Sequence, residues 1–129
     1  MAAQMARTPP AFGIVHVTLE SVIISCDEAY ASFLGVPRED AVGRRVAEFT
    51  TEDVGSGGPE TMISMIVRTG EPMSIRRRFV QPNGKKVPCV FQLCLIRDQD
   101  GLPCSVVGVG QALPELPIER APSAPGLKP

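Results

Sequence analysis

Residues 26–35 read CDEAYASFLG, and this stretch shows more about the fold than any other part of the chain. Asp27 is a preferred N-cap residue, because its side chain can accept a hydrogen bond from the free N–H groups that begin a helix. Positions 30, 33 and 34 carry Tyr, Phe and Leu, and this spacing places them on one helix face. Gly35 suits the left-handed position that closes a helix. The stretch therefore predicts a short helix, capped at both ends, with one apolar face.

Two short strands are predicted before this helix. Residues 14–19 and 22–26 are rich in β-branched side chains, which favour extended backbone, and Glu20-Ser21 predicts a tight turn between them. After the helix, residues 37–42 predict a single helical turn ended by Gly43, and residues 46–49 predict another.

A longer helix is predicted over residues 59–69. Pro59 fits the first helical position, and Gly70 fits the residue that ends the helix. Met62, Met65 and Ile66 lie on one face of this helix. Residues 50–58, which contain three glycines, are expected to form a flexible loop before it.

Three strands follow, over residues 73–80, 87–96 and 104–113. Asn83-Gly84 and the Asp-Gly pair at positions 100–101 mark the connections, because Asn and Gly tolerate the backbone angles of a hairpin turn. The three strands should therefore form an antiparallel meander. The helices between strands two and three then cover one face, which makes an α+β domain with a single sheet. We assign this domain to residues 14–113, with a flexible segment at 1–13 and a proline-rich tail or linker at 114–129.

Composition argues against several classes of function. The 129 residues carry a net charge of −1, so the basic excess typical of a nucleic-acid-binding protein is missing. A single histidine and four cysteines without C-x-x-C spacing give no basis for a zinc site or a Ser-His-Asp centre. No apolar run reaches the length of a membrane span, and the first residues do not resemble a secretory signal. We expect a cytoplasmic protein that is not an enzyme and binds neither membranes nor nucleic acid.

The order of these elements and several short motifs resemble a PAS domain, a sensor module of signalling proteins. Residues 26–35 resemble the family's first helix, and residues 37–43 (PREDAVG) resemble the turn that follows it. The segment from Arg78 to Gly84 is similar to a family hairpin, with Asn83 in place of Asp. Residues 98–101 (DQDG) and 106–109 (VVGV) resemble the closing strand and its turn. The resemblance implies a five-stranded antiparallel sheet of order 2-1-5-4-3. It also implies a pocket between that sheet and the longest helix, and flanking segments that often take part in dimer contacts.

PAS domains bind haem, flavins, small organic acids or nothing, and two of these classes fit the sequence poorly. Residues 43–50 (GRRVAEFT) stand where blue-light photoreceptors of the light-oxygen-voltage branch carry a reactive cysteine, and Val46 occupies the cysteine position. Gly110 falls where those domains place a glutamine, so thiol–flavin chemistry is not expected. Haem-binding members commonly use a histidine on the long helix, whereas His16 lies on the first strand. The cofactor, if there is one, stays unknown.

Strand alternation indicates which side chains face the helices. In residues 73–80 the inward positions are Ile75, Arg77 and Phe79. The inward positions of residues 87–96 begin at Cys89. The candidate pocket-lining residues are Tyr30, Phe33, Met62, Met65, Ile66, Arg77, Phe79, Cys89, Phe91 and Leu93.

Two of these candidates have more than one interpretation. An inward Arg77 is costly to bury unless it is paired. It either clamps a carboxylate or phosphate ligand, or reaches the rim and pairs with an acidic residue of a helix. Tyr30 either packs in the core with its hydroxyl satisfied locally, or offers a hydrogen bond into the pocket.

The opposite face of the sheet is too apolar to be left open to water. Its residues include Val90, Gln92, Ile96, Val107 and Val109. Such a face suggests a homodimer or a partner domain, although a terminal segment folded over it would serve equally. We therefore consider two functions: a sensor that binds a small ligand and reports it through a dimer or partner, and a ligand-free interaction module.

Overall fold

The computed structural model of the chain describes residues 12–50 and 59–114. The strands are β1 (Phe12–Thr18), β2 (Ile23–Cys26), β3 (Met73–Val80), β4 (Lys86–Arg97) and β5 (Pro103–Ala112), and the helices are α2 (Glu28–Leu34), α3 (Arg38–Ala41), the 3₁₀ turn η1 (Val46–Phe49) and α4 (Pro59–Thr69). The predicted loop at 50–58, apart from Thr50, lies outside the described residues. So do the predicted head and tail, apart from Phe12, Gly13 and residue 114.

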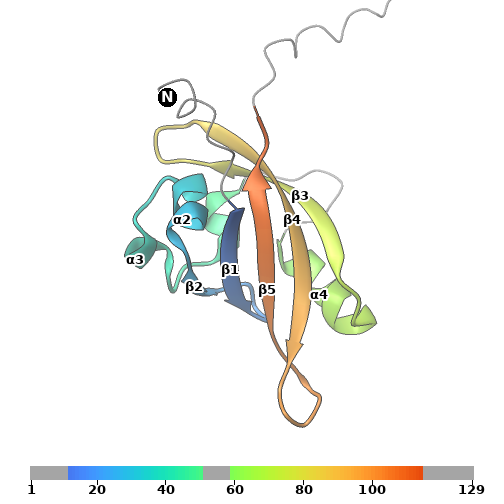
Figure 1. Cartoon of the computed structure of the whole chain (residues 1–129). Helices are drawn as coiled ribbons and strands as arrows, with labels where there is room; N and C mark the ends of the chain where they lie inside the picture. The colour runs from blue at the N-terminus through green and yellow to red at the C-terminus, as the bar shows by residue number, and fades with distance from the viewer. Residues whose placement is uncertain (1–11, 51–58, 115–129) are drawn as a thin grey trace, which may run out of the picture.

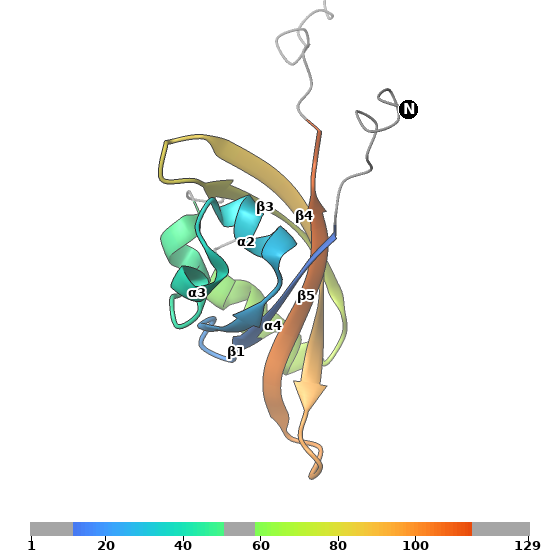
Figure 2. The same cartoon turned by 60° about the vertical axis from the view of Figure 1, so that its left-hand side comes forward.

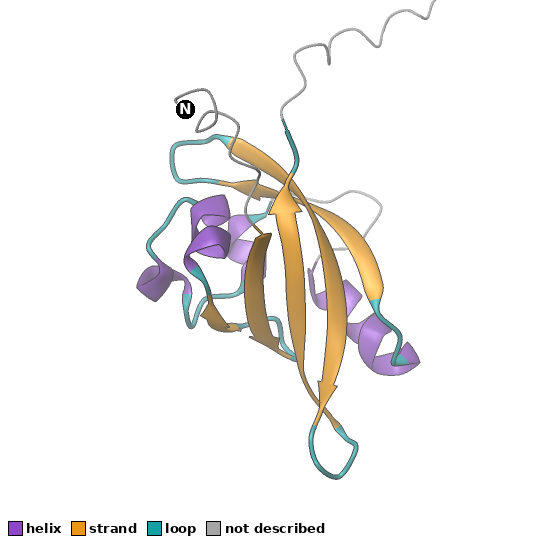
Figure 3. Ribbon diagram, viewed as in Figure 1, coloured by secondary structure: helices purple, strands orange, loops and turns teal. Residues whose placement is uncertain are grey.

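The five strands form one antiparallel sheet of order β2-β1-β5-β4-β3, as the resemblance implied (Figure 1). The helices lie together on one face of this curved sheet (Figure 2). The predicted α+β class and strand order are therefore confirmed. The β4–β5 hairpin is the longest pair of strands and extends beyond the body of the sheet (Figure 3).

One boundary differs from the sequence prediction by more than a residue. The first strand begins at Phe12 and not at residue 14, because Phe12 and Gly13 continue the ladder and pair with Gln111 and Gly110. β5 is long enough to offer these partners. The first strand therefore starts two residues earlier than predicted.

Helix α2 forms as its sequence predicts. The Oδ1 atom of Asp27 accepts hydrogen bonds from the N–H of Tyr30 at 2.9 Å and from that of Ile14 at 3.1 Å. It therefore caps the helix and ties its start to β1. Gly35 ends the helix with φ 77°, and its N–H donates to the carbonyl oxygen of Ala31.

Gly13 lets α2 approach the sheet closely. Gly13 and Gly110 are partners in the β1–β5 ladder. A Cβ at Gly13 would lie 2.9 Å from the Cα of Tyr30 and 2.8 Å from a ring carbon of Phe33. The helix backbone thus occupies space that a side chain would otherwise need.

The η1 segment links the two edges of the sheet across its covered face. Isolated bridges pair Val22 with Arg45 and Thr50 with Phe79. β2 and β3 are the edge strands, so the segment from Arg45 to Thr50 spans the concave side and encloses the space between sheet and helices.

Candidate functional site

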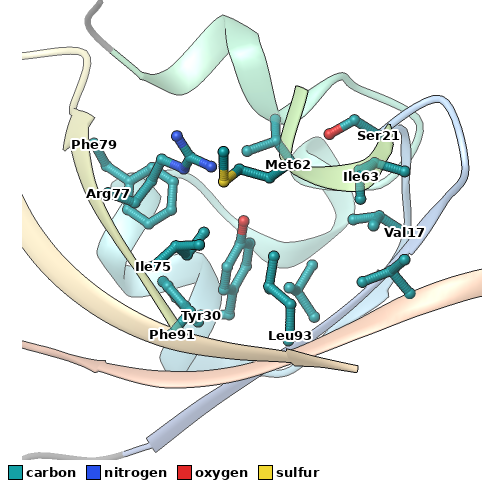
Figure 4. A pocket seen from close by; sticks show the side chains of 14 residues that line it. Val17, Ser21, Tyr30, Met62, Ile63, Ile75, Arg77, Phe79, Phe91 and Leu93 are labelled. Carbon is teal, nitrogen blue, oxygen red and sulfur yellow. The ribbon is translucent and has the colours of Figure 1, made fainter. Parts of the chain in front are cut away.

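A cavity of about 40 Å³ lies between the covered face of the sheet and the helices. Its walls come from four of the five strands, the β1–β2 turn, α2, η1 and α4 (Figure 4). The lining residues are Val15, Val17, Ser21, Tyr30, Val46, Met62, Ile63, Ile75, Arg77, Phe79, Phe91, Leu93, Val106 and Gly108. The wall is thus almost entirely apolar, with Arg77 as its single charged side chain among the described residues.

Strand alternation places the sheet residues of the site as predicted. The burial patterns of β3 and β4 turn Arg77, Phe79, Cys89, Phe91 and Leu93 toward the helices. Six of the ten predicted residues line the cavity: Tyr30, Met62, Arg77, Phe79, Phe91 and Leu93.

The other four predicted residues lie outside the cavity wall. Phe33, Ile66 and Cys89 are buried in the solid core, and Met65 is partly buried against it. Phe33 fills space beside Gly13, where α2 rests directly on the sheet. The inward direction was therefore predicted correctly, but the extent of the cavity was not.

Eight lining residues were missing from the predicted set. Val15, Val17, Val106 and Gly108 are inward positions of β1 and β5, and the alternation applied to β3 and β4 would have found them. Ile75 was predicted to point inward but was left out of the predicted lining residues. Ile63 follows Met62, which was included, in the chain. The sequence offers no comparable signal for Val46 or for Ser21, a buried turn residue with φ 68°.

Tyr30 combines the two roles that the sequence left as alternatives. Its ring lies edge-on to Phe33, Phe79 and Phe91, with centroid separations of 6.3, 5.7 and 5.7 Å. Its hydroxyl points into the cavity (Figure 4). Burial raises the pKa of Tyr30 well above its usual range, and the nearby charge of Arg77 lowers it by less. The hydroxyl therefore stays neutral and can donate a hydrogen bond.

Arg77 faces the cavity and not a solvent-exposed rim. The residue is only 4% exposed, and its guanidinium lies next to the Met62 side chain, on the same side of the cavity as the Tyr30 hydroxyl (Figure 4). Its neighbours Arg76 and Arg78 are exposed. The run of three arginines therefore divides by alternation into one buried cation and two surface cations.

The histidine and the cysteines lie apart from this cavity. The Nε2 atom of His16 is 2.6 Å from the Oγ atom of Ser105 in the adjacent strand. Burial raises the pKa of the Cys89 thiol to about 12, and burial also raises the pKa of Cys26, with a smaller contribution from Asp27. In the described part of the chain no cluster of three His, Cys, Asp or Glu side chains is placed to hold a metal ion.

The uncovered face of the sheet, called the outer face below, carries the predicted apolar residues. Val90 and Val107 are half-buried there, and Ile96 and Val109 are exposed beside Gln92. A shallow groove of about 190 Å³ crosses this face. Its lining residues are Phe12, Ser74, Val90, Phe91, Gln92, Val109, Gly110 and Gln111.

Comparison with known proteins agrees with this architecture. The family model described as PAS fold matches residues 11–113. The chain belongs to the PAS family. PAS domains in general serve as sensor or interaction modules in signalling. No curated protein matches the chain.

Several solved PAS structures share the fold at low identity. A tryptophan-to-alanine variant of the Drosophila melanogaster Cycle PAS-B domain with bound glycerol has a TM-score of 0.67 at 11% identity, and the match covers 78% of this chain and 99% of that one. A PAS domain of an HTR-like protein from Haloarcula marismortui has a TM-score of 0.64 at 15% identity over 87% and 93% of the two chains.

VqmA bound to DPO has a TM-score of 0.63 at 20% identity. That match covers 88% of this chain but 58% of VqmA, so the PAS domain corresponds to little more than half of that protein. Within the described residues of this chain, no helix has the length and apolar character needed to span a membrane.

Proposed function

We propose that this PAS domain is a cytoplasmic, non-catalytic sensor module that binds a small molecule in the cavity beneath α4. The observation that carries the proposal is the placement of a buried cation, Arg77, and a neutral donor, the Tyr30 hydroxyl, in an otherwise apolar wall. Ligand sites commonly combine apolar walls with a few convergent polar groups. Two similar structures, the Cycle PAS-B variant with bound glycerol and VqmA bound to DPO, support the same use of the fold.

The size of the cavity restricts the ligand. A volume of about 40 Å³ has room for about three water molecules, whereas drug-sized ligands occupy roughly 300–1,000 Å³. A ligand of a few heavy atoms fits the cavity as it stands. Met62 offers a way to enlarge it, because a methionine side chain changes rotamer easily.

Ligand binding can be tested by thermal denaturation of the full chain against a library of metabolites with up to eight heavy atoms. We expect at least one compound to raise the melting temperature, since a ligand that binds only the folded state stabilises it. Ile75→Phe should abolish that rise, because the larger side chain of this half-buried lining residue would fill part of the cavity. Ile14→Phe, at an exposed position of β1, should preserve it. A library without any active compound, or a rise that survives Ile75→Phe, would contradict the proposal.

We further propose that a second copy of this chain covers the outer face and passes the signal on. Phe12 is 61% exposed and stands at the margin of the groove that Val90 and Val109 help to line. In a dimer with two-fold symmetry each contact occurs twice, so Phe12 of each copy can enter the groove of the other copy.

Val109→Arg should dissociate this dimer, because it places a charge in the middle of the apolar face. We expect sedimentation velocity at about 100 µM protein to give a dimer for the wild-type chain and a monomer for the variant. At this concentration even a dimer with a dissociation constant in the micromolar range is well populated. Leu102→Arg, at an exposed position in the β4–β5 turn, should leave the dimer intact. A wild-type chain that stays monomeric would mean that no second copy covers this face.

A ligand-free interaction module is the second candidate, and the small volume of the cavity favours it. In that case the cavity is a packing defect that holds water, and only the outer face acts. The two experiments separate the candidates, since this module would dimerise or bind a partner but show no rise in melting temperature with any compound.

A further inference from the structure

We infer that the cavity recognises a short monocarboxylate of two to four carbons, with its carboxylate on Arg77 and Tyr30 and its alkyl chain along the apolar wall. This inference rests on the proposed ligand-binding function and specifies the class of ligand. It depends on three observations: the buried cation, the direction of the Tyr30 hydroxyl, and the size and polarity of the remaining wall.

The buried guanidinium favours an anion. Arg77 is 4% exposed and is the single charged side chain among the described residues that line the cavity. A guanidinium carries five N–H donors, so it can serve a ligand in addition to a contact within the protein. Charge-assisted hydrogen bonds from arginine to a carboxylate are often bidentate, and in a site shielded from water they are stronger than neutral ones.

Tyr30 provides a second donor on the same side of the cavity. The hydroxyl and the guanidinium both point into the space beside Met62 (Figure 4). The hydrogen bonds within the described part of the chain include none to this hydroxyl. Because burial keeps the phenol protonated, it can donate to an anionic oxygen.

The rest of the wall favours a carboxylate over a phosphate. Apart from the Ser21 hydroxyl, the rest of the wall is apolar, and Val17, Val46, Ile63 and Val106 offer no hydrogen bonds from their side chains. A phosphate would place several of its oxygens against these groups without donors, which costs affinity, whereas a short alkyl chain fits them. The space for about three water molecules matches a carboxylate group with a short chain.

The test compares acids with amides of the same shape. The full chain is titrated with sodium acetate, propionate and butyrate, and with acetamide and propionamide, at constant ionic strength. Binding is followed by the ¹³C-methyl NMR signal of Met62. We expect propionate to shift this signal and to bind at least about tenfold more tightly than propionamide, because the amide cannot form the charge-assisted pair.

Substitutions identify the side chains that bind the carboxylate. Arg77→Met should reduce the affinity for propionate to that for propionamide, and Tyr30→Phe should reduce it by a few fold. Arg78→Met, which removes an exposed arginine of the same strand, should leave it unchanged. If Arg77→Met does not fold, Arg77→Lys keeps the charge without the bidentate geometry and should weaken binding to an intermediate degree.

The possible outcomes separate this inference from the proposed function. Equal affinities for propionate and propionamide, or unchanged affinity in the Arg77 variants, would overturn the carboxylate assignment. If glycerol or the amides shift the Met62 signal and the acids do not, the ligand-binding function stands and the carboxylate class is wrong. If neither these compounds nor the metabolite library affect the protein, both proposals fall.

Discussion

Phe91→Ala should lower the free energy of unfolding by about 3–5 kcal/mol, the range found when a buried phenylalanine is cut back to alanine. Phe91 makes three ring contacts in the aromatic cluster, as many as Tyr30. Its ring centroid lies 5.7 Å from that of Tyr30, 6.1 Å from that of Phe79 and 6.3 Å from that of Phe33, always edge to face. Edge-to-face pairs stabilise a core beyond the apolar area they bury. The substitution removes three such pairs and joins a new void to the existing cavity.

Urea denaturation of the variant and of the wild-type chain at the same low concentration measures this loss. Phe12→Ala makes the same chemical change at a residue that is 61% exposed, so it should alter the stability by less than about 1 kcal/mol. A loss below that value for Phe91→Ala would show that the aromatic cluster does not hold the helices on the sheet.

Gly110→Ala should be the most damaging addition of a single methyl group, with a loss of about 3 kcal/mol or more. A Cβ at this position would lie far inside van der Waals contact with the carbonyl oxygen of Val90 and with the Phe91 ring. The carbonyl belongs to the β4 backbone and cannot rotate away without breaking the ladder. The damage is therefore steric, since Gly110 does not have a positive φ.

Val109→Ala is the matched control, because it changes the adjacent residue on the outer face. We expect it to alter the stability by no more than about 0.5 kcal/mol under conditions that keep the chain monomeric. Similar losses for the two variants would mean that β4 and β5 are not packed as closely as the structure has them.

The fold was largely predictable from local signals. Asp27, Gly35 and the apolar spacing between them determine α2, and the Asn83-Gly84 turn determines the β3–β4 hairpin. These signals act over a few residues, so they can be recognised in the sequence. The strand order required the PAS resemblance, because hairpins alone order the last three strands but do not place β1 beside β5.

The candidate site was predictable in direction but not in extent. A period of two turns Arg77, Phe79 and Phe91 toward the helices, whatever lies above them. Whether a given inward residue lines open space depends on how closely a helix approaches. That distance is set here by Gly13, because its missing Cβ leaves room for the backbone of Tyr30. Phe33 and Cys89 were therefore expected in the cavity wall but lie in solid core.

The role of Ser21 illustrates a second limit. Its left-handed backbone arises from the hydrogen bonds of the β1–β2 turn, in which its N–H donates to the carbonyl oxygen of Thr18 at 2.9 Å. Serine has no strong preference for this conformation, so the sequence does not indicate it. The turn is nevertheless what brings this hydroxyl to the cavity wall.

The central claim is that the cavity beneath α4 is a ligand site, and isotope-filtered NOE spectroscopy tests it most directly. The spectrum would be recorded with unlabelled propionate and uniformly ¹³C-labelled protein. We expect cross-peaks from the propionate protons to the methyl groups of Met62, Ile63 and Val17, which all line the cavity. Cross-peaks only to Val90 and Val109 on the outer face would contradict it, as would the absence of cross-peaks both from propionate and from every compound that raises the melting temperature.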